Sequence, residues 1–189
     1  MEENTIWMRI ISILRIGQSR DQRVVLAFGL SKLTYILVNT ILIYVAGLLI
    51  GDTLNCLSYF LVFFFLRTYA GGYHAHSKAR CLIVTCIIEV CAIFAISLIH
   101  FNMFSLIACM VLSILIYMLA PIESVNKPLT KEEQHLYKSK TAVAVLLCMA
   151  VVIIDNYVGN YYICVGIYVA LIEVFLMMFP KLVVILNHS

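Results

Sequence analysis

Charged residues are scarce in this chain: Lys, Arg, Asp and Glu make up only 12% of its 189 residues, whereas 63% are hydrophobic. Water-soluble domains carry about a quarter charged residues, so this composition excludes an ordinary soluble globule. The mean hydropathy of +1.03 instead indicates an integral membrane protein, for which lipid is the main solvent.

Other sequence patterns are missing as well. The apolar runs do not alternate with polar residues, which favours helices over a barrel. Arg9 and Arg15 interrupt the first apolar stretch and no small-residue cleavage site follows it, so we do not expect a cleavable signal. The seven cysteines contain no CxxC pair, and all except Cys81 lie inside apolar runs or at their edges. A disulfide framework is therefore not expected.

The apolar residues form six segments. They cover approximately 28–50, 54–66, 82–99, 101–120, 141–154 and 161–179. Because a membrane span needs about 20 helical residues, the second and fifth segments must borrow flanking residues, thin the bilayer or pack against protein. We predict an all-α, polytopic membrane protein with about six transmembrane helices, forming one integral membrane domain over residues 1–189.

The positive charges predict the orientation of these helices. Lys and Arg occur before the first apolar segment, in a first loop (residues 67–81) and in a second loop (residues 121–140). The connections around Asp52, Asn102 and Asp155 contain neither residue type. The positive-inside rule then places both termini and both basic loops in the cytoplasm of a multi-pass protein of the cell membrane.

Two further features concern the membrane itself. Residues 1–23 combine an apolar helical stripe with arginines, which predicts an amphipathic helix lying at the membrane surface. Glu89 and Glu173 fall inside apolar segments, where charged side chains are costly and are candidates for a functional polar site. Lys32 lies near the end of a segment, where its side chain can snorkel to the interface.

The first loop, "RTYAGGYHAHSKARC", concentrates the reactive side chains of the chain. On a continuous helix, His74 and Cys81 would lie about 10 Å apart, too far for contact. Gly71 and Gly72 allow the chain to turn back, and Ser77 can cap a new helix whose first turn contains Cys81. The spacing therefore permits a histidine and cysteine pair.

Such a pair would perform nucleophilic catalysis. The positive end of a helix and the cations Lys78 and Arg80 favour the thiolate of Cys81, and His74 can serve as its base. Backbone N–H groups of the glycine turn or the Arg67 side chain could stabilise an oxyanion. Acyl transfer through a thioester is the chemistry that these residues would support.

Other interpretations remain open on spacing alone. His74, His76 and Cys81 do not have a familiar zinc spacing, so no metal site and no cofactor are predicted. The first loop could be a solvated basic segment that anchors the helices to anionic lipid, or it could serve transport or binding. The second loop fits either a linker with a short amphipathic helix or a docking surface for a charged partner.

The first loop closely resembles the signature of the accessory gene regulator B (AgrB) family of membrane endopeptidases, which mature peptide signals in quorum sensing. The resemblance rests on an arginine, a glycine before a histidine, and a cysteine seven residues after that histidine. The second loop, "APIESVNKPL", also resembles a family motif. The matching residues are Arg67, Gly72, His74, Cys81, Ala120, Pro121, Glu123, Asn126, Lys127 and Pro128.

The resemblance implies a specific substrate, an AgrD-type propeptide with an amphipathic leader and an acidic tail. Cys81 would attack the peptide bond before the tail with His74 as base, and an internal cysteine or serine would then close a thiolactone or lactone ring. Arg67 and Gly72 would position the substrate. The tail would bind the cations of the two loops, which include Lys78, Arg80, Lys127 and Lys131.

The family resemblance also implies a homodimer and gives no reason to expect nucleic-acid binding. One alternative is a transporter or exporter of a peptide or anionic solute, in which Glu89 and Glu173 line the path. Another is a non-catalytic partner of a sensor kinase. Dependence on Cys81 and His74 discriminates the enzyme from the transporter.

Overall fold

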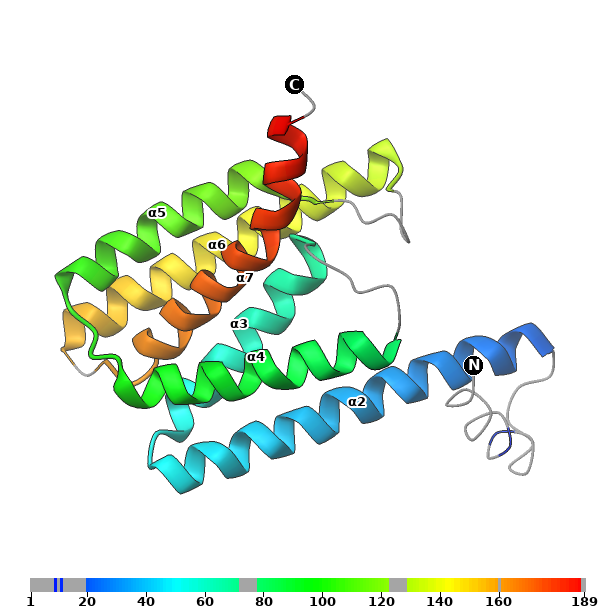
Figure 1. Ribbon diagram of the computed structural model, residues 1–189, viewed down its shortest axis with the longest axis horizontal. Helices are drawn as coiled ribbons and strands as arrows, with labels where there is room; N and C mark the ends of the chain where they lie inside the picture. Colours follow the sequence, from blue (N-terminus) through cyan, green and yellow to red (C-terminus); the bar gives the residue numbers. More distant parts are fainter. Residues whose placement is uncertain are drawn as a thin grey trace. The chain divides into compact units, whose positions relative to one another are not determined.

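The computed structural model describes residues 20–71, 78–122, 129–159 and 161–187, together with residues 9 and 11. These residues form six α-helices and no strand (Figure 1), which confirms the predicted all-α class for this part of the chain. The helices are α2 (Arg20–Ile50), α3 (Thr53–Tyr69), α4 (Lys78–Leu98), α5 (Met103–Leu119), α6 (Lys131–Val158) and α7 (Cys164–Asn187). Most of the predicted interfacial helix, residues 1–23, lies outside the described residues.

The chain divides into two compact units, residues 1–42 and 43–189. In the second unit, α3 packs against α4, α6 and α7, and α5 packs against α6 and α7. Helices α5, α6 and α7 run alongside one another in Figure 1. Helix α7 contacts all four of the other helices, α3 to α6, and its most extensive contact is with α3, so these two helices form the centre of the bundle.

Helix α3 reaches the centre because its buried side chains recur at helical spacing. Cys56, Tyr59, Phe60, Phe63 and Leu66 are all buried, and their intervals of three and four residues place them on one face of the helix. The rings of Tyr59 and Phe63 stack with centroids 5.6 Å apart. One face of α3 therefore supplies much of the bundle core.

Small residues bring α3 and α7 into close contact. A Cβ atom on Gly166 of α7 would collide with the Asn55 carbonyl oxygen and the Ser58 hydroxyl of α3. The Gly166 N–H donates to the Asn55 side-chain oxygen over 2.9 Å, and the Ser58 hydroxyl donates to the Ile163 carbonyl over 3.1 Å. Glycine is thus required here by backbone proximity, as is common between membrane helices.

Helix α6 is twice as long as the apolar segment from which it was predicted. It spans 28 residues mainly because Lys131–Lys140, assigned to the second loop from the sequence, form its first turns, and residues 155–158 extend its other end. Thr130 and Glu133 make a capping box, with the Thr130 hydroxyl accepting from the Glu133 N–H over 3.2 Å. The short fifth segment therefore gains its length from its polar N-terminal flank.

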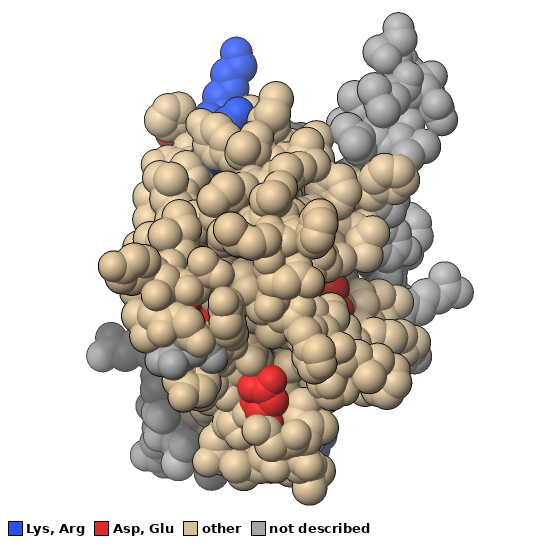
Figure 2. All heavy atoms as spheres, turned by 90° about the vertical axis from the view of Figure 1, so that its left-hand side faces the viewer, with Lys and Arg blue, Asp and Glu red and all other residues tan. Residues whose placement is uncertain are grey.

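Two of the described helices are long and apolar enough to cross a membrane, Asp21–Ile50 and Lys131–Val158. Three further apolar stretches are shorter, Val84–Leu98, Met103–Leu119 and Cys164–Phe179. Large apolar side chains are also exposed on the second unit, including Phe104 and Leu146. The face drawn in Figure 2 consists mostly of uncharged residues, with a few acidic atoms and a basic side chain at its upper edge. These features indicate a membrane protein.

Candidate functional site

The bases of the two polar loops are joined to each other. The Ile122 N–H donates to the Ala70 carbonyl over 2.8 Å, and Gly71 and Ile122 form a parallel bridge. Gly71 has a φ of +82°, and a Cβ atom there would collide with the Ile122 carbonyl oxygen. Glycine is required at this position both by its conformation and by the close approach of the second chain segment. The first and second loops therefore begin side by side.

The predicted catalytic segment is bounded by two helix ends. Arg67 lies in the last turn of α3 and is partly buried, where a cation suits the negative end of the helix dipole. Helix α4 begins at Lys78, so Cys81 is in its first turn and Arg80 precedes it. Gly72, His74 and His76 lie outside the described residues, and the side chains of residues 78–83 are not described.

The second loop contributes one described candidate to the tail-binding group. Lys131 is the first residue of α6 and is exposed. Lys127 lies outside the described residues. Because Ile122 pairs with Gly71 and Lys131 begins α6, both described ends of the second loop belong to the same end of the bundle as the N-terminus of α4.

Lysines and tyrosines gather at this end of the bundle. The Lys140 ammonium lies 4.9 Å from the centroid of the Tyr69 ring, and the Lys138 ammonium lies 5.5 Å from that of Tyr117. Tyr69 also meets Tyr137 edge to face, with centroids 5.9 Å apart. Aromatic and cationic side chains of this kind are enriched where membrane helices leave the hydrocarbon. We call these five residues the interfacial belt.

The two intramembrane carboxylates come together around a tyrosine. The hydroxyl of Tyr59, which is fully buried in α3, donates to a carboxylate oxygen of Glu173 in α7 over 2.7 Å. Glu89 of α4 is 9% exposed and lies close enough to interact electrostatically with both groups. These three residues form a polar cluster within the bundle, in which Tyr59 and Glu89 are buried and Glu173 is half-buried.

Sequence reasoning identified Glu89 and Glu173 but missed Tyr59. A buried tyrosine usually needs a partner for its hydroxyl, and Tyr59 is one of the few polar residues in the apolar segment of α3. This signal could have paired it with an intramembrane carboxylate. The interfacial belt was also missed, although Tyr117 and the two lysines of α6 stand at the ends of apolar segments.

No group of three or more His, Cys, Asp or Glu residues that could hold a metal ion occurs among the described residues. The cysteines that the structure describes are free, four of them buried and two exposed. They are Cys56, Cys86, Cys91, Cys109, Cys148 and Cys164. In this part of the chain, the cysteines are therefore single thiols without a disulfide partner.

Comparison with known proteins gives relatives of one kind. An AgrB-like protein of Clostridium perfringens strain SM101 is 23% identical over 139 residues, covering 69% of this chain and 65% of the relative. AgrB-like protein 1 of strain 13 of the same species is 36% identical over 104 residues, covering 54% of each chain. The matches thus span less than two thirds of these relatives' lengths. No solved structure matches the chain.

The model of one protein family, accessory gene regulator B, matches residues 4–179. This match includes all six described helices up to the last part of α7, and both polar loops. The resemblance seen in the two loop motifs therefore extends over almost the whole sequence. The chain belongs to the accessory gene regulator B (AgrB) family.

Proposed function

We propose that this protein is a membrane cysteine endopeptidase that processes an AgrD-type quorum-sensing propeptide, with Cys81 as nucleophile and His74 as general base. The observation that carries the proposal is the position of Cys81 in the first turn of α4, the helix that follows the first loop, whose base Gly71 pairs with Ile122 of the second loop. Family membership adds the substrate class. A helix N-terminus favours a thiolate, which is the reactive form of cysteine.

The first half of the reaction is cleavage. The thiolate of Cys81 attacks the carbonyl carbon of the peptide bond before the acidic tail, and a carbon–sulfur bond forms as the carbon–nitrogen bond breaks. His74, having accepted the thiol proton, returns it to the leaving amine. Arg67, at the end of α3, and backbone N–H groups near Gly72 are the candidates for stabilising the oxyanion. The peptide is left as a thioester on Cys81.

The second half is ring closure. An internal cysteine or serine of the bound peptide attacks the thioester carbonyl, and the bond to Cys81 breaks as the thiolactone or lactone bond forms. For an internal cysteine the exchange conserves one thioester, so no external energy source is required. Binding of the released tail by Lys78, Arg80, Lys127 and Lys131 would hold the acidic segment near these loops.

The membrane arrangement belongs to the same proposal. Six helices would cross the bilayer as one membrane domain, with both termini and both loops in the cytoplasm. Residues 1–23 would lie at the interface, where the amphipathic leader of the propeptide is also concentrated. The working form would be a homodimer. Helices α2 and α6 are long and apolar enough to cross, and α3 and α5, with 17 residues each, lie at the lower limit of the length that a span needs.

The decisive experiment is intact mass spectrometry of membranes that contain this chain and its candidate propeptide. Wild type is compared with Cys81→Ser, Cys81→Ala and the control Cys86→Ala, which changes an exposed cysteine five residues further along α4. We expect tail cleavage and a hydroxylamine-sensitive peptide adduct with wild type and Cys86→Ala only. Equal cleavage by Cys81→Ala would exclude Cys81 as the nucleophile.

A second candidate function is transport, favoured by the polar cluster of buried Tyr59, buried Glu89 and half-buried Glu173. Buried carboxylates in membrane helices commonly mark substrate or ion paths. A transporter would lose activity in Glu173→Gln and keep it in Cys81→Ala. An endopeptidase requires Cys81 instead, so measuring uptake or export beside cleavage in these two variants separates the functions.

A further inference from the structure

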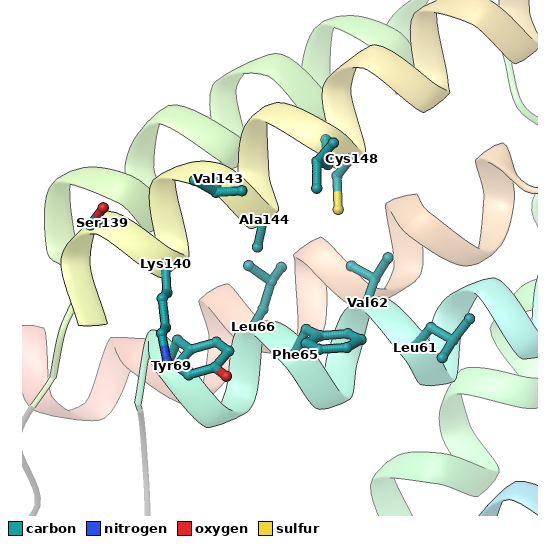
Figure 3. Close-up of a pocket in the computed structure, with 11 residues that line it drawn as sticks. Leu61, Val62, Phe65, Leu66, Tyr69, Ser139, Lys140, Val143, Ala144 and Cys148 are labelled. Carbon is teal, nitrogen blue, oxygen red and sulfur yellow. The ribbon is translucent and has the colours of Figure 1, made fainter. Parts of the chain in front are cut away.

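A groove of about 460 Å³ runs between α3 and α6, outside the residues assigned to the proposed reaction. Figure 3 shows its two walls, with Leu61, Phe65 and Tyr69 on α3 facing residues of α6. The opposite wall includes Val143 and Ala144, and Lys140 lies at the end nearest Tyr69. Leu147 of α6 also lines the groove. The groove is large enough for a single small ligand.

The groove is polar at one end and apolar along the rest of its length. Leu66 and Cys148 are buried in its floor, and its remaining lining is almost wholly aliphatic or aromatic. Lys140 is the one charged residue in the described lining, and Ser139 lies next to it in the chain at the same end. The Lys140 ammonium reaches over the Tyr69 ring. This distribution suits an amphipathic occupant with a negatively charged end.

The direction of the groove discriminates between occupants. Its lining on α3 extends from Leu61 to Tyr69, eight residues or roughly 12 Å along the helix axis. The charged end coincides with the interfacial belt at Tyr69, Tyr117 and Lys138, and the apolar part extends toward the middle of the bundle. An amphipathic helix that lies in the plane of the interface would run across this groove. A lipid molecule, with its head group at the interface, would lie along the groove.

We propose that this groove is a binding site for an anionic phospholipid. The phosphate is held by the ammonium of Lys140, and one acyl chain lies between α3 and α6 against Phe65 and Leu147. Basic pockets between helices at the membrane surface bind anionic head groups in this way. The site is independent of the proposed peptidase reaction, because it uses no residue of the Cys81 segment.

The test measures lipid retention by the full chain. The protein is placed in nanodiscs of phosphatidylcholine with a minority of phosphatidylglycerol of identical acyl chains, transferred to mild detergent, and its bound lipids are counted by native mass spectrometry. We expect wild type to retain phosphatidylglycerol preferentially. Lys140→Gln should reduce this preference about fivefold, the effect of one interfacial lysine. Lys138→Gln is the matched control, since Lys138 is exposed on the same helix outside the groove.

A second pair of variants tests the acyl-chain part of the site. Ala144→Phe adds bulk within the groove without changing charge, whereas Leu146→Phe adds bulk at an exposed position of α6 outside it. We expect only Ala144→Phe to lose both lipids. Equal retention of the two lipids by wild type, or a preference that survives Lys140→Gln, would overturn the proposal. Full retention by Ala144→Phe would also overturn it, and crosslinking of an amphipathic peptide at Val143 in that case would assign the groove to a peptide.

Discussion

The two ends of the helical bundle are built differently. At the end formed by the starts of α3, α5 and α7, side chains bind neighbouring segments: Asn55 accepts from the Gly166 N–H, and Asp155 accepts from the Ile163 N–H over 3.2 Å and from the Cys164 thiol over 3.1 Å. At the opposite end, two polar loops meet at Gly71 and Ile122 beneath lysines and tyrosines. We call these the closed end and the loop end.

The comparison of the two ends shows which end of this fold can carry catalytic residues. Polar groups at the closed end are used by contacts between helices, so they contribute to stability. The loop end instead has charges and backbone turns around two connections that the bundle holds together at one point. Functional residues commonly stand on loops positioned by a rigid scaffold, and the proposed nucleophile Cys81 belongs to this end.

The largest expected effect is found by comparing a histidine at the loop end with a histidine at the closed end. His74→Ala should lower the rate of propeptide cleavage by about 10²–10⁴, the usual contribution of a general base. His100→Ala should leave it unchanged, because His100 is exposed in the connection between α4 and α5 at the closed end. Cleavage is followed by mass spectrometry at equal protein levels. Similar losses in both variants would contradict the assignment of the chemistry to the loop end.

The next effect concerns the paired loop bases. Gly71→Ala should destabilise the pairing by about 2–5 kcal/mol, because the new Cβ is strained by the positive φ and collides with Ile122. Gly51→Ala is the matched control at the closed end, where φ is +77° but no atom lies within 4 Å of the Cβ position. It should cost only about 1–2 kcal/mol. Cleavage activity should fall in Gly71→Ala and persist in Gly51→Ala.

A substitution at the closed end should lower the stability of the protein without changing the cleavage rate of the folded molecules. Gly166→Ala should lower the free energy of unfolding by about 1–3 kcal/mol, because its Cβ would push α7 away from Asn55 and Ser58 of α3. Unfolding is measured by titrating a denaturing detergent into micelles. The fraction that stays folded should cleave the propeptide at the normal rate. A rate that falls further than the folded fraction would show that the two ends are coupled.

The smallest effect compares helix caps at the two ends. Thr130→Ala removes the capping box of α6 at the loop end, and Asn102→Ala removes the side chain that accepts from the Ser105 N–H at the start of α5. Each should cost about 1 kcal/mol of stability. Only Thr130→Ala should also weaken binding of an acidic tail peptide, since Lys131 follows directly. Equal peptide affinities in the two variants would show that the start of α6 is not part of the surface that binds the tail.

Much of the fold was predictable from hydropathy. The six apolar segments correspond in order to α2–α7, because continuous apolar runs of this length satisfy their backbone only as helices. The start of a helix just before Cys81 was also predictable from the glycines and the serine upstream. The true N-terminal limit of α6 was missed, because its first ten residues are mostly polar and only the Thr130 and Glu133 pair marks a helix start there.

The sequence by itself therefore determined the class of protein, the order of its helices and the two loops that carry the candidate chemistry, since these depend on composition and on residues close along the chain. Only the tertiary structure decided that Gly71 pairs with Ile122, that Tyr59 binds Glu173 and that α3 and α6 leave a groove beside Lys140. These contacts join residues about 50 to 114 positions apart. They follow from how side chains of different helices fit together, which the hydropathy of any one segment does not contain.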